Sequence, residues 1–468
     1  MRNVRKIKAK RSLKIQGQKG ITLLVLVVTI IVLLILAGIT IGALTGENGI
    51  IKNARESKEQ TEISNEKEIL EKATVEAMGK NKYGNIEESE LQSELDKETG
   101  EGKTEAVDVG EKFEVLFKEG NRYYTVDKDG NVGEVNEYYK DENPGDITIG
   151  ENGEKLDGNT EKTAYQIGSI EDLVAFSNMV NGEGVRLEDG NPVTITATER
   201  TSFSGKYIVL KRNLNFKSRL SYADSERTDF GDINGNANDG NSLMNEMTTG
   251  RGFKPIGLWK ENNTVINFAG DFNGQNYKID NLYIEYSNYE NKGTPIGLFG
   301  SGNSSNTIIS NLEISGEING QWHTGGIIGG RVKSITNCIN KANITGYNMV
   351  GGVAGYNDYG HTNINECENY GEINITGADY GYGGAGGIVA NSGTEGNVTN
   401  CKNYGEIGKN SVNNKGGISY GGIVGRMGGS SKIDNCKNEG KVIMNSENTS
   451  TYIGGITGAC GYRCYNRL

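Results

Sequence analysis

Gly386-Gly-Ile-Val-Ala390 is one copy of a unit of two glycines and apolar residues that recurs in the C-terminal part of the chain. The five copies are Gly325-Gly-Ile-Ile-Gly329, Gly351-Gly-Val-Ala-Gly355, Gly386-Gly-Ile-Val-Ala390, Gly421-Gly-Ile-Val-Gly425 and Gly454-Gly-Ile-Thr-Gly458. A second unit alternates with the first, at Asn337-Cys-Ile-Asn340, Glu366-Cys-Glu-Asn369, Asn400-Cys-Lys-Asn403 and Asn435-Cys-Lys-Asn438. Two short strands per repeat, separated by Gly and Asn turns, are typical of a solenoid. The repeat predicts a mainly β protein with a parallel β-helix over 311–468; a β-sandwich is the alternative.

A cysteine recurs at one place in the second unit. The predicted ladder is Cys338, Cys367, Cys401, Cys436 and, in a shortened copy, Cys464. Because stacked coils lie about 4.8 Å apart, these side chains are expected to point inward along one face. A large core favours buried free thiols over a disulfide framework. Cys460, outside the ladder, could pair with Cys464 or another chain. Without a Cys-x-x-Cys or paired-His motif, no metal and no cofactor are expected.

A strand and an amphipathic helix are predicted over Ala164–Asn181, with Ser169 as the helix cap. Further short motifs follow in order: Phe203-Ser-Gly-Lys-Tyr-Ile-Val-Leu210, Phe253-Lys-Pro-Ile-Gly257, Phe268-Ala-Gly-Asp-Phe-Asn-Gly274, Tyr277-Lys-Ile-Asp-Asn-Leu-Tyr-Ile284 and Gly297-Leu-Phe-Gly300. The series resembles the lead-in of bacterial surface proteins that carry GLUG repeats. That resemblance implies a right-handed parallel β-helix, with 164–310 as its capping lead-in.

The chain begins with a basic leader and a long apolar run. Residues 1–20 carry eight Lys and Arg and no acidic residue, and 21–44 carry no charge. A helix of 24 residues is roughly 36 Å long, whereas the hydrocarbon core of a bilayer is about 30 Å thick. The sequence predicts a membrane-spanning helix with its N-terminus in the cytoplasm and the C-terminal domain outside the cell.

The junction Lys19-Gly20-Ile21-Thr22-Leu23-Leu24 resembles the type IV prepilin and pseudopilin family. The resemblance implies that a prepilin peptidase cuts between Gly20 and Ile21 and methylates Ile21. Family members usually have Glu at the fifth residue after the cut, where this chain has Val25. In the family that Glu assists subunit docking, so its absence bears on filament assembly more than on membrane insertion or cleavage. An uncleaved single-pass anchor is the alternative.

The predicted domain order follows from these patterns. Apolar residues recur at mostly helical spacing to about Met78, so one long pilin-like helix is expected, although a juxtamembrane stalk has the same periodicity. Short alternating runs around Asp127-Lys-Asp-Gly-Asn131 predict a β-hairpin. The expected segments are a leader (1–20), the helix (21–79) with its transmembrane half (21–44), a small β region (80–140), a linker (141–163), the lead-in (164–310) and the repeat β-helix (311–468).

Composition and motifs exclude several functions. Without the leader, the chain has 41 basic and 60 acidic residues. This net charge of −19 argues against nucleic acid as a partner. The chain has only two histidines, His323 and His361, and no hydrolase or phosphate-loop motif, so no enzyme is expected. Asp127 and the loop Asp229–Asp239 could belong to calcium-binding loops, but the residue types of both segments fit ordinary turns better.

Two function classes remain. The first is a membrane- or pilus-anchored adhesion protein, a minor or tip pilin, that binds a glycan or a host or matrix protein. Exposed or half-exposed tyrosines would supply the contacts: Tyr347, Tyr356, Tyr359, Tyr370, Tyr380, Tyr382 and Tyr420. The second is a pseudopilin or type II secretion subunit whose solenoid is a spacer. The expected partners are the prepilin peptidase, the membrane, and pilus or secretion-system subunits, with the protein at the cell membrane and cell surface.

Overall fold

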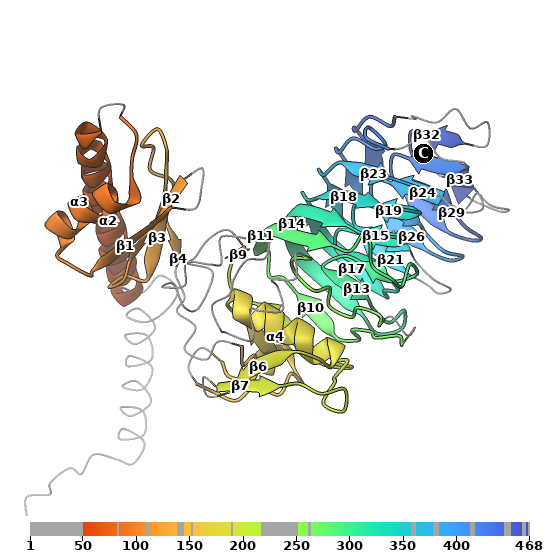
Figure 1. Ribbon diagram of the computed structural model, residues 1–468, viewed down its shortest axis with the longest axis horizontal. Helices are drawn as coiled ribbons and strands as arrows, with labels where there is room; N and C mark the ends of the chain where they lie inside the picture. Colours follow the sequence, from red (N-terminus) through yellow and green to blue (C-terminus); the bar gives the residue numbers. More distant parts are fainter. Residues whose placement is uncertain are drawn as a thin grey trace, which may run out of the picture. The chain divides into compact units, whose positions relative to one another are not determined.

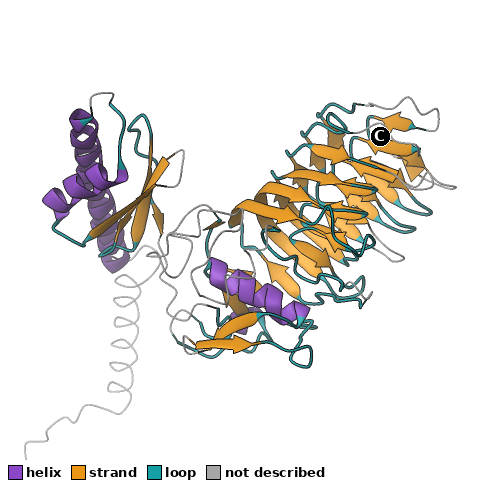
Figure 2. Ribbon diagram, viewed as in Figure 1, coloured by secondary structure: helices purple, strands orange, loops and turns teal. Residues whose placement is uncertain are grey.

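The computed structural model describes most of the chain beyond residue 49. The described residues are 50–81, 84–108, 112–137, 145–150, 153–188, 191–216, 251–260, 264–356, 362–377, 383–411, 417–443, 451–460 and 465–466. The chain divides into two compact units, Met1–Lys72 and Ala73–Leu468. Figure 1 follows the elements along the sequence, and Figure 2 shows that strands dominate the described part.

Two helices and a small antiparallel sheet come first. The elements are α2 (Ile50–Lys80), α3 (Glu88–Thr99), β1 (Thr104–Asp108), β2 (Lys112–Phe117), β3 (Arg122–Asp127) and β4 (Asn136–Glu137). The strands pair in the order β1-β2-β3-β4, each antiparallel to the next. Buried residues alternate along β3, where Tyr124 and Val126 are fully buried, so one face of the sheet forms a core.

The predicted long membrane-spanning helix is wrong. The described residues contain three α-helices, α2, α3 and α4 (Ile170–Asn181), and none is long and apolar enough to cross a membrane. The longest, α2, carries Lys, Arg or Glu in nearly every turn, and charged side chains are costly inside a bilayer. The single-pass membrane location is overturned by the same finding. The predicted span 21–44 itself lies outside the described residues.

The Asp127 segment forms a turn after β3. The Asp127 carboxylate accepts hydrogen bonds from the backbone N–H of Asp129 (3.0 Å) and Asn131 (2.8 Å) and from the Asn131 amide (2.8 Å). These hydrogen bonds hold the pKa of Asp127 below its usual value, the Asn131 amide having the largest effect. The carboxylate is therefore occupied by the turn it stabilises.

Glu94 on α3 is buried under two lysines, and its charge should stabilise this part of the chain. Lys80 and then Lys97 contribute most to lowering the pKa of Glu94 to about 2. A lowered pKa stabilises the fold above the ordinary Glu value, and that contribution is lost as the pH falls through 2. We expect Glu94→Gln to speed hydrogen exchange of residues 88–117 at pH 7, with a smaller effect toward pH 2. The control is Glu87→Gln, because Glu87 is exposed. Equal exchange rates in Glu87→Gln and Glu94→Gln at pH 7 would contradict a stabilising role for the Glu94 charge.

The rest of the described chain is a solenoid built on three parallel sheets. The long sheet contains β5 (Tyr165–Ile167), β8 (Tyr207–Leu210), β9 (Leu214–Asn215), β10 (Asp271–Asn273), β11 (Lys278–Glu285), β14 (Ile308–Asn319), β17 (Ser334–Asn340), β18 (Asn343–Gly346), β21 (Asn363–Asn365), β22 (Glu368–Asn369), β23 (Ile373–Ile375), β26 (Asn397–Thr399), β27 (Lys402–Asn403), β30 (Lys432–Asp434), β31 (Lys437–Asn438) and β34 (Tyr465–Asn466). The second contains β12 (Pro295–Ile296), β15 (His323–Gly325), β19 (Met349–Gly351), β24 (Gly383–Gly386), β28 (Ile418–Gly421) and β32 (Tyr452–Gly454). The third contains β13 (Phe299–Ser301), β16 (Ile328–Gly330), β20 (Ala354–Tyr356), β25 (Val389–Asn391), β29 (Val424–Met427) and β33 (Thr457–Cys460).

The chain visits these sheets in the same order in successive coils. One coil runs through β17 and β18 of the long sheet, then β19 of the second and β20 of the third. Equivalent strands pair in register, so like residues stack. One inward column of the long sheet is aliphatic over five successive coils: Ile309, Ile335, Ile364, Val398 and Ile433. The apolar core therefore runs along the interior of the stack.

Helix α4 closes the N-terminal end of this core, as Figure 1 shows. Its N-cap is Ser169, whose hydroxyl accepts a hydrogen bond from the Asp172 N–H, and Gly182 ends it in the left-handed conformation. Phe176 packs against Phe203, Phe268 and Phe272 at centroid distances of 5.0 to 6.2 Å. Covering the first coil in this way prevents water from reaching the end of the core.

Two further small elements and a buried stretch adjoin the cap. They are the turn helix η1 (Glu161–Thr163) and the antiparallel hairpin of β6 (Val185–Glu188) and β7 (Asn191–Thr194). In the segment expected as a linker, Ile147 and Leu156 are buried, and Ile147 belongs to the solenoid core. Residues 145–150 and 153–163 thus include parts of the folded structure.

A column of asparagines lies at the ends of strands β17, β22, β27 and β31 of the long sheet; its first three members are buried and Asn438 is half-buried. Asn340, Asn369, Asn403 and Asn438 stack so that each amide N–H₂ donates to the Oδ1 of the next, at 2.7 Å in all three steps. Each amide also donates to a backbone carbonyl two residues further along its own coil. The column thus satisfies buried polar groups that the coil corners leave inside the solenoid.

Candidate binding site

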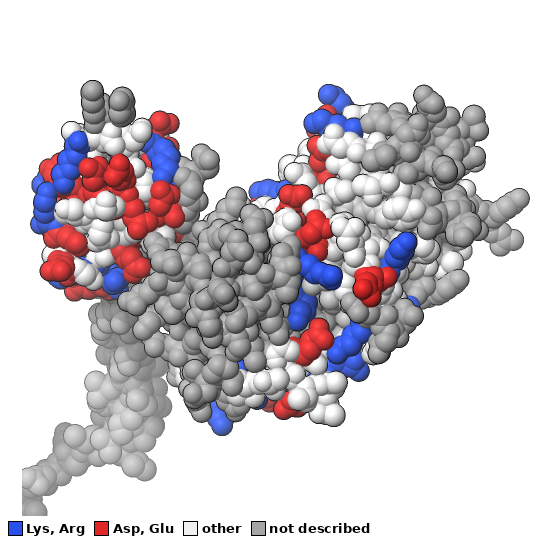
Figure 3. Space-filling view, in the orientation of Figure 1, with Lys and Arg blue, Asp and Glu red and all other residues white. Residues whose placement is uncertain are grey.

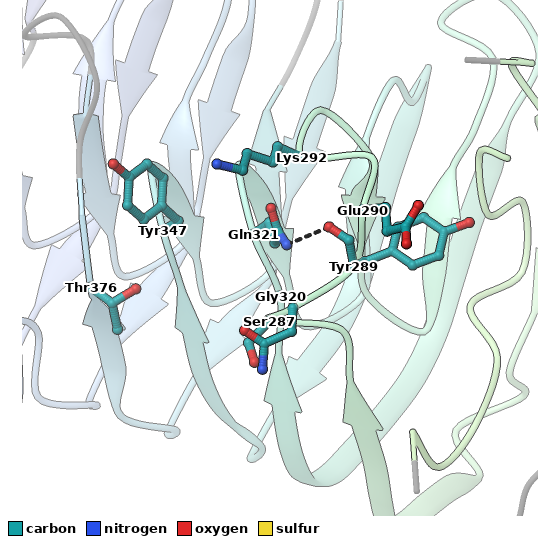
Figure 4. A pocket seen from close by; sticks show the side chains of 9 residues that line it. Ser287, Tyr289, Glu290, Lys292, Gly320, Gln321, Tyr347 and Thr376 are labelled. Atoms are coloured by element: carbon teal, nitrogen blue, oxygen red, sulfur yellow. Dashed lines mark hydrogen bonds between the residues drawn. The ribbon is translucent and has the colours of Figure 1, made fainter. Parts of the chain in front are cut away.

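A lateral pocket opens where the chain passes from the long sheet to the second sheet. Its volume is about 380 Å³, and consecutive coils supply its walls. The lining residues are Ser287, Asn288, Tyr289, Glu290, Lys292, Gly320, Gln321, Tyr347 and Thr376. Figure 4 shows these side chains around the opening. We refer to this set as the lateral pocket.

One wall is the loop after β11, which hydrogen bonds hold in place. The N–H of Tyr286 donates to the Asn319 carbonyl at 2.7 Å, and the Tyr289 hydroxyl donates to the Trp259 carbonyl at 3.0 Å. Buried Gln321 donates its amide to the Tyr289 carbonyl at 2.6 Å, drawn as the dashed line in Figure 4. The loop is therefore fixed against the next coil.

The opposite wall contains Tyr347, which is half-buried. Its N–H donates to the Gln321 carbonyl at 2.7 Å, which places the two residues side by side in neighbouring coils. The ring lies over Gly377, where a Cβ atom would overlap it. The Thr376 hydroxyl donates to the Gly346 carbonyl at 3.1 Å. Gly377 is thus required for the position of the Tyr347 ring.

Two opposite charges lie at the mouth of the pocket. Glu290 and Lys292 are exposed, and neither makes an ion pair with another described residue. In Figure 4 the Lys292 side chain extends toward Tyr347. The pocket therefore offers one carboxylate, one ammonium, several amides and hydroxyls, and an aromatic ring. Such a lining suits a polar, hydroxylated ligand, which can donate and accept hydrogen bonds and pack one face on the ring.

The predicted tyrosines do not share one surface. Tyr347 lines the lateral pocket, and Tyr356 is half-buried and stacks on His323 at 4.7 Å. Tyr370 is 46% exposed and stacks on Tyr404 at 4.6 Å. Tyr420 is 1% exposed and belongs to the core, so its predicted exposure is wrong. Tyr359, Tyr380 and Tyr382 lie outside the described residues.

The ladder cysteines lie along the inner side of the long sheet. Cys338, Cys367 and Cys401 are fully buried, Cys436 is half-buried, and all four are free thiols. Each thiol donates to the carbonyl two residues earlier, at 3.1 to 3.4 Å. Burial raises the pKa of Cys367 well above its ordinary value, which makes that thiol a poor nucleophile. Cys460 is disulfide-bonded, and Cys464 lies outside the described residues.

Several other predicted features also fall outside the described part. These are the processing residues Gly20 and Ile21, the loop Asp229–Asp239 and His361. Within the described ranges, no group of three or more His, Cys, Asp or Glu residues could hold a metal ion. The prediction that the chain is not an enzyme stays a prediction.

Sequence reasoning missed Tyr289, Lys292 and Gln321. The signal for Gln321 was present, because Gln321 and Tyr347 each stand four residues before a Gly-Gly unit, at Gly325 and Gly351. That shared offset puts both residues in one column of the solenoid. The loop that carries Tyr289 and Lys292 is a longer connection in one coil, and the repeat does not reveal its position.

Comparisons with known proteins give no family. No family model matches the sequence, and no curated protein matches it. A solved structure, described as a candidate immunoglobulin A1 protease from Bacteroides ovatus, matches with a TM-score of 0.35 and 19% identity. The match covers 65% of this chain and 87% of that chain. A likeness at this TM-score and identity supports no conclusion about this chain.

Proposed function

We propose that this chain is an adhesion or interaction protein whose solenoid binds a short segment of glycan in the lateral pocket. One observation carries the proposal: the half-buried Tyr347 ring lines the same cavity, of about 380 Å³, as amide, hydroxyl and charged side chains. Ligand pockets usually measure about 300–1,000 Å³, so this volume suits a short segment.

The described lining of the lateral pocket favours a hydroxylated ligand over a charged polymer, because its only charged residues, Glu290 and Lys292, have opposite signs. In Figure 3, the described solenoid residues facing the viewer are mostly uncharged, with scattered lysines and acidic residues. A highly charged polymer would need a run of one sign. Glycans bind through hydrogen bonds and aromatic contact, and the pocket offers both.

A glycan array probed with the full chain tests the proposal. We expect selective binding, weakened about tenfold by Tyr347→Ala, because an aromatic contact contributes about 0.5–1.5 kcal/mol beyond its buried area. The matched control is Tyr370→Ala, which removes an exposed tyrosine outside the pocket. Absence of binding to every glycan, or equal binding by Tyr347→Ala and wild type, would contradict the proposal and favour the solenoid as a spacer.

A further inference from the structure

A second cavity lies on the outer face of the long sheet, next to the capped end. Its volume is about 260 Å³, and its lining includes Lys206, Tyr207, Asp271, Asn306, Ile308 and Lys333. It shares no lining residue with the lateral pocket. We call it the cap-side cavity.

Asp271 is held between neighbouring strands at this cavity. In register, Asp271 on β10 lies beside Tyr207 on β8 and Ile308 on β14. The residue is half-buried, and among the described residues its carboxylate accepts no hydrogen bond and makes no ion pair. Burial raises the pKa of Asp271 above its ordinary value, and the charge of Glu161 adds to the shift while Lys333 opposes it. A half-buried carboxylate without a partner is costly unless a ligand donates to it.

The two lysines at the cavity differ in their freedom. The Lys206 ammonium donates to the Asp157 carbonyl and to the Asn159 Oδ1, both at 2.7 Å, so it is fixed. Lys333 makes no hydrogen bond or ion pair through its side chain within the described residues. The Asn306 amide donates to the Ser204 hydroxyl at 3.4 Å, which places two more polar groups at the rim.

These groups select the charge and size of a ligand. Two lysines disfavour a metal cation or an amine, and the unpaired carboxylate disfavours an anion. A neutral ligand with several hydroxyls satisfies both, because a hydroxyl donates to Asp271 and another oxygen accepts from Lys333. The volume falls below the usual 300–1,000 Å³ range, so the ligand is smaller than a drug-sized molecule.

We propose that the cap-side cavity binds a single neutral sugar ring, with its hydroxyls donating to Asp271, an oxygen accepting from Lys333 and Tyr207 forming the apolar side. The inference is independent of the lateral pocket, because a different set of strands and side chains carries it. It adds a monosaccharide site to the proposed glycan segment site.

Saturation-transfer NMR of the full chain with D-glucose, D-galactose, D-mannose and N-acetyl-D-glucosamine tests the inference. We expect at least one sugar to bind, with a titrated Kd that rises at least about tenfold in Asp271→Asn, because hydrogen bonds to a charged group are strong. Lys333→Met should raise the Kd as well. Asn397→Ala is the control, since Asn397 has the equivalent outward position four coils further along.

The outcomes separate this site from the lateral pocket. Binding that survives Tyr347→Ala and Asn397→Ala but weakens in Asp271→Asn supports the inference. Three results would overturn it: no sugar binds, Asp271→Asn binds as wild type does, or Tyr347→Ala abolishes the signal. The last result would place the sugar in the lateral pocket. Loss of array binding alone, with the monosaccharide result intact, would count against the proposed function only.

Discussion

Gly387→Ala is expected to destabilise the solenoid by about 3 kcal/mol, the upper end of ordinary overpacking costs. A Cβ atom at Gly387 would overlap the Gly422 carbonyl oxygen and lie 2.6 Å from the Oδ1 of Asn403. Neither atom can move away easily, because one is backbone of the next coil and the other is locked in the asparagine column. Gly387 does not have a positive φ, so the cost is one of space.

The chain contains a matched control for this substitution. Gly455 occupies the same place in the last Gly-Gly unit, and a Cβ atom there would meet no atom within 4 Å. Urea unfolding followed by circular dichroism should give a lower midpoint for Gly387→Ala and a nearly unchanged one for Gly455→Ala. Equal midpoints for the two variants would show that the coils are not packed as closely as described.

Asn403→Asp should destabilise the protein by roughly 3–5 kcal/mol at neutral pH, because it leaves a buried charge without a counter-charge. Asn403 is fully buried, and its amide donates to the Gly405 carbonyl at 2.9 Å and to the Asn438 Oδ1 at 2.7 Å. In the variant, a carboxylate oxygen would face these two acceptors. Burial would raise the pKa of the new carboxyl group in the folded state above its unfolded value.

The raised pKa fixes the sign of the pH dependence. Below the unfolded value, near 3.9, the carboxyl group is protonated in both states and can donate one hydrogen bond. Stability relative to wild type is then lost as the pH rises through the folded-state pKa. The control is Asn435→Asp, since Asn435 is exposed and Asp tolerates its left-handed conformation (φ 50°). Free energies of unfolding measured at pH 4 and pH 8 test this prediction. If Asn403→Asp and Asn435→Asp lost equal free energies of unfolding at pH 8, the described burial of the asparagine column would be contradicted.

The repeat carried most of what could be predicted about the solenoid. The recurrence of the Gly-Gly units and of the cysteine units predicts strands that pair with their own copies. Asn365 and Thr399 each stand two residues before a ladder cysteine, and they pair as this recurrence predicts. Ser169 at the start of α4 was readable because a helix cap is a local feature. The exposure predicted for Tyr420 is wrong, although the strand register indicates that this residue is buried. It aligns with Val350 and Ala385, which point into the core.

The rest depends on contacts between residues far apart in the sequence. The lateral pocket needs the loop around Tyr289, which occurs in one coil and is fixed by hydrogen bonds to Trp259 and Gln321. Asp271 meets Tyr207 and Ile308 across intervals of 64 and 37 residues, and no repeat period relates these intervals. The membrane-spanning helix was inferred from residues 21–44, whereas the described α2 is rich in charge. Patterns that recur can be read from sequence, and single insertions cannot.

Hydrogen exchange of the full chain with and without a glycan selected on the array tests the central claim most directly. We predict slower exchange in residues 286–294, 320–321 and 346–347, the backbone that forms the lateral pocket. Tyr347→Ala should lose this protection at the same glycan concentration, and Tyr370→Ala should retain it. Protection confined to other parts of the solenoid, or no protection at saturating glycan, would contradict the lateral pocket as the binding site.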